Sequence, residues 1–189
     1  MSQTPTDSVR WTTTDIDLLA NNDGTRYEIV DGELFVTRAP HWMHQEACGN
    51  IYSELKNWSR AKDLGRATIN PGIIFTDSDN VIPYVAWASN ERLAVLLDEA
   101  GHLTGAPELV VEVLSSGAEQ ERRDKEAKLK LYSLRGVQEY WIADWRLEKV
   151  EIYRRENAAL VLVATLTSED ELISPLLPDF KCSVGRFFE

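Results

Sequence analysis

The chain has 189 residues, of which 43% are hydrophobic and 27% charged, and these proportions exclude a disordered chain and fit one domain with its own core. Its formal net charge of -11, from 31 acidic and 20 basic residues, argues against a protein that holds nucleic acid by bulk electrostatics. Any contact with nucleic acid is therefore expected to be local.

Neither membrane insertion nor secretion is indicated. No apolar run approaches the roughly 20 residues that a membrane-spanning helix needs, and residues 1–7 lack the basic-then-apolar layout of a signal peptide. Cys48 and Cys182 are the only cysteines and lie far apart, so neither a disulfide framework nor a zinc site is suggested. We expect a cytoplasmic protein without membrane contact, in which both thiols are buried or half-buried.

A short helix and a β-hairpin are expected first along the chain. Threonines at 12–14, followed by Asp15 and apolar residues, are typical of a capped helix start. Residues 27–30 and 33–36 are predicted to pair around Asp31-Gly32, because Asp-Gly supplies the positive φ angles of a two-residue turn. We place residues 1–25 in an N-terminal extension with this short helix, and residues 1–189 in a single domain.

A long helix and two strands follow. Apolar residues recur at helical spacing over 44–62, which predicts an amphipathic helix packed against a sheet. Strands are expected at 67–75 and 81–88, separated by the polar turn 76–80. Residues 91–100 are expected to form a short helix.

The second half of the chain begins with its most apolar strand, 108–114. A run without clean alternation implies burial on both faces, so this strand is predicted to be central. A helix over 119–134 follows, with Gly136 as its C-cap. Residues 138–143 are predicted to return as a strand, 149–154 and 160–166 to form an antiparallel pair, and a tail closes the chain.

Basic residues gather in the helix 119–134. Acidic residues at 119, 121, 124 and 126 interleave with them, so a solvated helix face with ion pairs is the preferred interpretation of the run. Lys128 is considered separately below. The basic residues are Arg122, Arg123, Lys125, Lys128 and Lys130, with Arg135 just beyond.

Glu112 stands in the middle of the apolar strand. A buried carboxylate is costly unless it is paired, hydrogen-bonded or bound to a metal, so this residue requires an explanation. Because side chains alternate along a strand, Glu112 and Leu114 share one face, while Val111 and Val113 share the other.

A lysine is the expected companion of such a carboxylate. In nucleases whose metal site is written as Asp, then Glu-x-Lys, the lysine would stand at position 114, where this chain has Leu114. If the next helix folds back across the strand, Lys128 can reach the same pocket, with Asp124 and Tyr132 one turn away on either side.

Several separate blocks, in order along the chain, carry a family resemblance. No single block is specific, but the ordered set is, and over about residues 27–188 the chain resembles the Uma-type putative restriction endonuclease family of the PD-(D/E)XK nuclease superfamily. The resemblance implies an α/β (α+β), restriction-endonuclease-like fold, with a mixed central sheet flanked by helices. The blocks are residues 27–32, His44, Pro83, residues 106–115, Lys128 with Tyr132, and residues 136–141.

The resemblance also implies roles for individual residues. Glu112 would be a ligand of Mg²⁺, or of Mn²⁺ as a substitute, and the backbone carbonyl of Val113 would join it. Lys128 would orient or deprotonate the attacking water and stabilise charge on the phosphate. Mg²⁺ suits such a site, because it prefers oxygen ligands and needs only one or two protein carboxylates beside the substrate phosphate. DNA is the implied substrate, and cutting both strands would favour a homodimer.

One residue departs from the family pattern, which has Pro-Asp before the strand that precedes Glu112. Here the pair is Pro83-Tyr84, and a phenol, protonated at neutral pH, is a poor ligand for Mg²⁺. Asp79 would lie about 16 Å away along an extended strand, too far to substitute unless the turn bends back. Glu28 is the better replacement ligand, because many enzymes of the superfamily take an extra acidic ligand from an N-terminal element.

Other polar and aromatic residues receive simpler interpretations. His44 could face the site, but a local hydrogen bond at its helix N-terminus is the preferred interpretation. Trp87, Tyr140 and Trp141 are expected in the core rather than as platforms for stacked bases. Glu139 and Asp144 are expected in surface or hydrogen-bonding roles.

Two classes of function stay open. One is a Mg²⁺-dependent DNA endonuclease with a degenerate site, in which Tyr84 replaces the first aspartate. The alternative is a catalytically inactive nuclease-fold protein that binds DNA or a protein partner. A metal-dependent hydrolase of another substrate is a weaker third reading. Tyr84 favours the inactive protein, whereas Glu112 and the rest of the motif set favour the endonuclease.

Overall fold

The computed structural model describes residues 9–19, 25–37 and 40–189. Residues 1–7, on which the expectation of no signal peptide rests, lie outside these ranges, as do the other undescribed parts of the N-terminal extension. The expected short helix is α1 (Thr13–Leu19), and the expected hairpin is β1 (Arg26–Val30) with β2 (Glu33–Thr37). Asp31 and Gly32 have φ angles of 51° and 74°, as the Asp-Gly turn requires.

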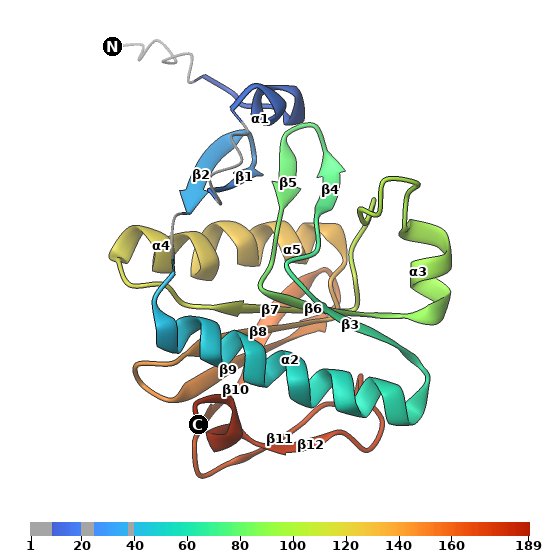
Figure 1. Cartoon of the computed structure of the whole chain (residues 1–189), viewed down its shortest axis with the longest axis vertical. Helices are drawn as coiled ribbons and strands as arrows, with labels where there is room; N and C mark the ends of the chain where they lie inside the picture. The colour runs from blue at the N-terminus through green and yellow to red at the C-terminus, as the bar shows by residue number, and fades with distance from the viewer. Residues whose placement is uncertain (1–8, 20–24, 38–39) are drawn as a thin grey trace.

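The two strands predicted at 67–75 and 81–88 are each divided between two sheets. β3 (Gly65–Ile69) and β6 (Val85–Ser89) pair with each other in the main sheet. β4 (Ile73–Thr76) and β5 (Asp79–Val81) form a hairpin that joins β1 and β2 in a small sheet of order β2-β1-β5-β4. Figure 1 shows this hairpin standing away from the main sheet, beside β1 and β2.

The prediction of two continuous strands was therefore wrong, for a local reason. Asn70 has a left-handed φ of 47°, and Pro71 and Gly72 follow it, so the chain bends out of the main sheet. Pro83 lies on the return path. Proline has no N–H to continue a ladder of hydrogen bonds, so each strand ends at these residues.

The main sheet has six strands in the order β10-β9-β8-β7-β6-β3. β7 (Leu109–Val113) and β8 (Glu139–Asp144) run parallel, and the other neighbours are antiparallel, so the sheet is mixed as expected. Every residue of β7 and β8 is buried, which confirms the prediction of a central strand. β9 (Lys149–Glu156) and β10 (Ala159–Thr167) are the predicted antiparallel pair.

Helices cover both faces of the main sheet (Figure 1). α2 (Trp42–Lys62) packs on the face that carries Val111 and Val113. The helix that follows β7 packs on the opposite face with Val110 and Leu114. The predicted alternation along β7 is thus confirmed, and Glu112 points toward the second helical layer.

The helix predicted over 119–134 is present but changes its winding. It consists of α4 (Ala118–Arg122), the π-helical turn η1 (Arg123–Lys128) and α5 (Leu129–Arg135), and it ends at Gly136 as predicted. A π-helical turn bonds i to i+5, so Arg123 and Lys128 come onto one face. Both are buried, and the interpretation of the basic run as a solvated face is wrong for Arg123. Arg122 and Lys130 are exposed as expected.

The remaining elements are one short helix and the C-terminal tail. α3 (Asn90–Leu96) is shorter than predicted. The C-terminal tail contains β11 (Glu171–Ile173), β12 (Lys181–Ser183) and the 3₁₀ helix η2 (Val184–Phe187), and it packs into the core beside α2. Cys48 and Cys182 are free and buried, as expected. None of the described helices has the length and apolar character needed to cross a membrane.

Candidate active site

Lys128 lies at the centre of a buried group of charged side chains. Its Nζ is 2.8 Å from Oε1 of Glu28 and 2.8 Å from Oε1 of Glu112. The Oδ1 atom of Asp124 is 3.7 Å from the same nitrogen, and all four side chains are without exposed area. The structure thus brings together three of the residues singled out from the sequence, Glu112 from β7, Lys128 from η1 and Glu28 from β1.

Hydrogen bonds hold the two glutamates in place. Oε1 of Glu28 also accepts the backbone N–H of Ile82 at 2.8 Å, which ties β1 to the segment leading into β6. The hydroxyl of Tyr132, one turn after Lys128, donates to Oε1 of Glu112 at 3.2 Å. The carboxylates are therefore positioned by β1, β7 and the helix together.

Two arginines complete the group. Nε of Arg123 is 3.0 Å from Oδ1 of Asp124, and its Nη1 is 3.9 Å from Oε2 of Glu28. Nε of Arg26 is 3.8 Å from the same Oε2 atom. We call these six residues the charged cluster: Glu28, Glu112, Asp124, Arg26, Arg123 and Lys128. Three acids face three bases, and such balance offsets the high cost of burying each charge.

The two glutamates that share Lys128 differ in acidity. Burial alone would raise the pKa of Glu28, but Lys128, Arg26 and Arg123 outweigh it and lower that pKa to about 2. At Glu112 burial dominates over the attraction of Lys128, and its pKa is raised to about 7. Burial would lower the pKa of Lys128, yet the surrounding carboxylates raise it. At neutral pH Lys128 is protonated, Glu28 is ionised, and Glu112 exchanges its proton.

Tyr84 lies beside the charged cluster and carries no charge into it. Its hydroxyl is 3.5 Å from Oγ of Ser115, and its ring meets His44 edge-on at 4.4 Å. The Cζ atom of Arg26 lies 4.1 Å from the centroid of the ring. Burial raises the pKa of Tyr84, so the phenol is protonated at neutral pH. The position therefore offers a divalent cation no negative charge.

The carbonyl of Val113, expected as a metal ligand, is engaged by His44. Nε2 of His44 lies 2.9 Å from this oxygen, and as the partner of a carbonyl it must carry the proton. Burial lowers the pKa of His44, so the ring is neutral. Nδ1 of His44 lies 3.3 Å from Oε1 of Gln45, but with the proton on Nε2 both of these atoms are acceptors, so the ring donates to β7 and not to its own helix. That His44 could face the site was considered from the sequence, but its contact with the carbonyl of Val113 was not predicted, since no sequence pattern places α2 against that strand end.

Other residues weighed from the sequence lie apart from the cluster. Asp79 accepts from Arg135 at 2.6 Å and from the N–H of Asp31 at 2.8 Å, in the small sheet. Glu139 and Asp144 are buried in hydrogen-bonding roles, as expected. The core positions predicted for aromatic residues are confirmed at Trp87, Tyr140 and Trp141.

A cavity of about 450 Å³ adjoins the charged cluster from outside. Three of its lining residues contact the cluster or Tyr84 beside it. Thr37 accepts from Nη1 of Arg123 at 3.0 Å, and Ser115 and His44 both contact Tyr84. We call it the entrance cavity. It is lined by Val36, Thr37, Pro40, His41, His44, Ser115, Ser116, Gln120 and Trp145. A smaller cavity, of about 240 Å³, lies on the other side of Arg123 and is lined by that residue itself.

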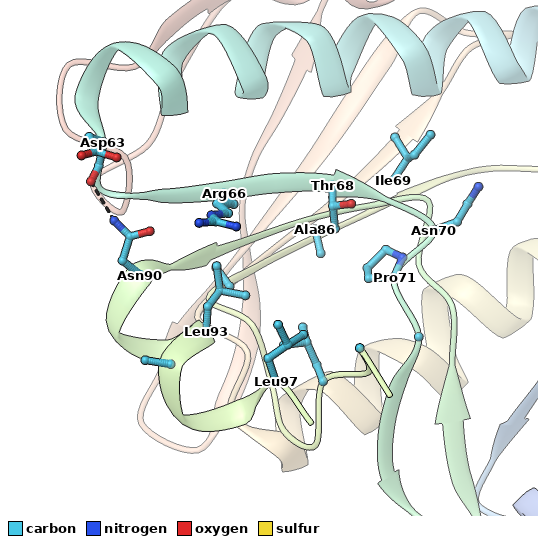
Figure 2. A pocket seen from close by; sticks show the side chains of 15 residues that line it. Asp63, Arg66, Thr68, Ile69, Asn70, Pro71, Ala86, Asn90, Leu93 and Leu97 are labelled. Atoms are coloured by element: carbon cyan, nitrogen blue, oxygen red, sulfur yellow. Dashed lines mark hydrogen bonds between the residues drawn. The ribbon is translucent and has the colours of Figure 1, made fainter. Parts of the chain in front are cut away.

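A larger hollow, of about 800 Å³, lies between β3, β6 and α3 (Figure 2). Its ionisable lining residues are Asp63 and Arg66, and Asn90 closes one end by donating to the carbonyl of Asp63 at 2.8 Å. No pair of carboxylates with a lysine is present in this lining. The chemistry expected from the sequence therefore belongs to the charged cluster and not to the larger hollow.

The fit of Mg²⁺ can be judged from the carboxylate oxygens. Oε2 of Glu28 and Oε2 of Glu112 are buried and have no hydrogen-bond partner. Carboxylate oxygens are ligands that Mg²⁺ prefers, so these two atoms fit the ion, whereas the phenol of Tyr84 does not. Across residues 9–19, 25–37 and 40–189, no group of three or more His, Cys, Asp or Glu side chains is arranged to hold a metal ion.

Comparison with known proteins agrees with the fold and the resemblance. Among solved structures, the chain is similar to a "putative nuclease belonging to DUF820" from Anabaena variabilis ATCC 29413, with 18% sequence identity and a TM-score of 0.74 over 94% of this chain and 97% of that chain. This similarity confirms the restriction-endonuclease-like fold. No curated protein sequence matches the chain. The Uma2 family model, described as "Putative restriction endonuclease", matches residues 13–185, and the chain therefore belongs to the Uma2 family.

Proposed function

We propose that this protein is a Mg²⁺-dependent DNA endonuclease whose reacting groups are Glu112, Lys128 and Glu28, and whose site is degenerate at Tyr84. The supporting observation is the ammonium of Lys128 at 2.8 Å from both glutamates, beside a cavity open to solvent. Burying this group is expensive for the fold alone, and strongly shifted pKa values of this kind gather at functional sites. Family and fold both support a nuclease.

Each reacting group has a distinct task in the proposal. Lys128 is held protonated by its carboxylates, so it donates to a phosphate oxygen and stabilises charge there instead of removing a proton from water. Glu112 has a pKa of about 7 in the metal-free site, so it releases its proton near neutral pH and its carboxylate would then hold Mg²⁺. Glu28 stays ionised and keeps Lys128 charged and oriented.

Glu112, Glu28 and the carbonyl of Val113 are the proposed ligands of Mg²⁺, with Mn²⁺ as its substitute. Mg²⁺, when bound, would polarise the phosphoryl oxygen and acidify a bound water. His44 fixes the orientation of the Val113 carbonyl through its 2.9 Å contact. The proposal includes a homodimer, since cutting both DNA strands usually needs two active sites, and a cytoplasmic location.

Cleavage of supercoiled plasmid DNA tests this proposal. The native chain is expected to nick the plasmid slowly in Mg²⁺ or Mn²⁺ and not in EDTA, while Glu112→Gln and Lys128→Met lose at least a hundredfold in rate. Glu151→Gln is the matched control, because Glu151 pairs with Lys125 outside the cluster at 2.8 Å. Cleavage by Glu112→Gln at the native rate would overturn the assignment.

Tyr84 favours a second candidate function, a catalytically inactive protein that binds DNA or a protein partner. The observation behind it is the uncharged phenol at the position where the family pattern has an aspartate. Fluorescence anisotropy with a labelled DNA duplex in EDTA tests the DNA-binding form. Binding without cleavage in either metal would favour this candidate over the endonuclease, whereas cleavage by the native chain that depends on Glu112 would eliminate it.

A further inference from the structure

Arg26 lies between the two positions from which a metal ligand is expected. It precedes Glu28 by two residues on β1, so both side chains point to the same face of the strand. Its Nε is 3.8 Å from Oε2 of Glu28, and its Cζ is 4.1 Å from the centroid of the Tyr84 ring. Only 14% of the side chain is exposed. A permanent cation thus stands next to both Glu28 and residue 84.

The guanidinium is held there by charge more than by directed hydrogen bonds. Nε and Nη2 of Arg26 are buried without a hydrogen-bond partner, and its Nη1 reaches Oδ1 of Asn70 at 3.4 Å. Oε2 of Glu28, 3.8 Å from Nε of Arg26, is also without a hydrogen-bond partner, as is Oε2 of Glu112. Buried donors and acceptors left unpaired carry a free-energy cost, so this contact is loose. A divalent ion can therefore displace the guanidinium of Arg26 from the carboxylate of Glu28.

Two carboxylates and the face of an aromatic ring keep Arg26 in this place. Burial would lower the pKa of its guanidinium, but Glu28, Tyr84 and Glu112 raise it. The ring of Tyr84 attracts the guanidinium through its electron-rich face and leaves the positive charge unneutralised. An aspartate at position 84 would instead form an ion pair with Arg26, and its carboxylate would not be free to bind a metal.

We infer that the guanidinium of Arg26 is the resident cation of this site, competing with a divalent ion for Glu28 and Glu112, and that a tight metal site requires changes at both Arg26 and Tyr84. This inference rests on the proposed function, because it takes Glu28 and Glu112 to be the metal ligands. It adds that an aspartate at position 84 would not by itself complete a metal site, since Arg26 on β1 supplies the positive charge that a metal ion would otherwise bring.

Isothermal titration with Mn²⁺ tests the inference on four proteins: the native chain, Arg26→Gln, Tyr84→Asp and the double variant. We expect the double variant to bind Mn²⁺ at least tenfold more tightly than either single variant, and the native chain to bind most weakly. Glutamine keeps a hydrogen-bonding side chain near Asn70 but removes the charge. Arg26→Lys keeps the charge and is expected to bind as weakly as the native chain. Arg66→Gln, in the larger hollow, is the matched arginine control and should leave Mn²⁺ affinity unchanged.

Two results would overturn the inference. One is Tyr84→Asp binding Mn²⁺ as tightly as the double variant, and the other is an unchanged affinity for Arg26→Gln. If the double variant does not fold, Arg26→Gln against Arg26→Lys decides the matter, because only the glutamine variant should gain affinity over the native chain. Plasmid cleavage is measured separately. A double variant that binds Mn²⁺ tightly but never cuts DNA would count against the endonuclease and leave the role of Arg26 intact.

Discussion

Glu28 and Glu112 contact the same ammonium group, yet they are acids of very different strength. Glu28 faces Lys128, Arg26 and Arg123, whereas Glu112 has Lys128 on one side and the carboxylates of Asp124 and Glu28 near it. A pair of carboxyl groups pushed apart in this way separates a permanent anion from a group that titrates near neutral pH. The local arrangement of cations, and not the residue type, decides which glutamate exchanges a proton at neutral pH.

This difference predicts how stability depends on pH. Glu28 has a folded pKa of about 2 against 4.5 in the unfolded chain, so its contribution is present above pH 4.5 and is lost as the pH falls toward 2. Glu112 has a folded pKa of about 7, so its contribution is present below pH 4.5 and is lost as the pH rises toward 7. At 1.36 kcal/mol per unit, that loss is roughly 3 kcal/mol in unfolding free energy.

Urea unfolding between pH 4.5 and 8 measures this fall. Glu112→Gln cannot ionise and is expected to flatten the part of the curve between pH 4.5 and 7. Glu151→Gln serves as the control. Burial would raise the pKa of Glu151, but Lys125, Tyr153 and Lys149 together outweigh it and lower that pKa, which places its titration below this window. An equally steep fall in Glu112→Gln would contradict the assignment of the raised pKa to Glu112.

Sequence reasoning placed Glu112, Lys128 and Glu28 in one site, and the structure brings them within hydrogen-bond distance. Burial of Glu112 followed from its apolar neighbours, and Lys128 from a helix that folds back across the strand. Glu28 followed from what the superfamily resemblance implies. Arg26 and Arg123 were missed as members of the cluster. The face that Arg123 occupies depends on the π-helical turn, whose i to i+5 bonding departs from the ordinary helical spacing on which the sequence prediction was based.

The helix that carries Lys128 depends on how it ends. Gly136, its C-cap, has a φ of 93°, and a Cβ atom built there would meet no atom within 4 Å. The cost of Gly136→Ala is therefore a pure backbone cost, about 1 to 2 kcal/mol for a left-handed residue. Thermal or urea unfolding measures it.

Gly49 provides the opposite case. It lies inside α2, and a Cβ atom there would also meet nothing within 4 Å. Gly49→Ala is expected to stabilise the protein by about 0.5 to 1 kcal/mol, because alanine loses less backbone freedom in a helix. Equal effects of the two substitutions would show that the left-handed turn at Gly136 is not what ends the helix.

At the scale of the whole molecule, the apolar pattern predicted most of the strands and helices, and the family resemblance predicted the mixed main sheet flanked by helices. The small sheet was not predicted, because its strands β4 and β5 leave the main sheet at Pro71 and return at Pro83, inside segments whose composition is otherwise that of continuous strands. That excursion matters for the site, since the small sheet holds β1 and with it Glu28 and Arg26.

The outer edge of the main sheet bears on the proposed homodimer. β10 is a nine-residue outer strand, and Val161, Leu162 and Val163 are 40%, 50% and 40% exposed along it. A long apolar edge presents unpaired backbone groups and favours pairing with another strand. We expect β10 to pair with β10 of a second copy, and analytical ultracentrifugation to show a dimer that Leu162→Lys shifts toward monomer.

Leu134→Lys is the matched control, because Leu134 is 72% exposed on α5 and not on the sheet edge.

Salt dependence separates this dimer from DNA binding. Two copies that each carry a net charge of -11 repel each other, so added salt should strengthen the dimer by screening that repulsion. Added salt should weaken any binding of DNA, because contacts to phosphates release counterions. A dimer that dissociates as salt is raised would place oppositely charged groups at its interface, and would exclude the apolar edge of β10 as its basis.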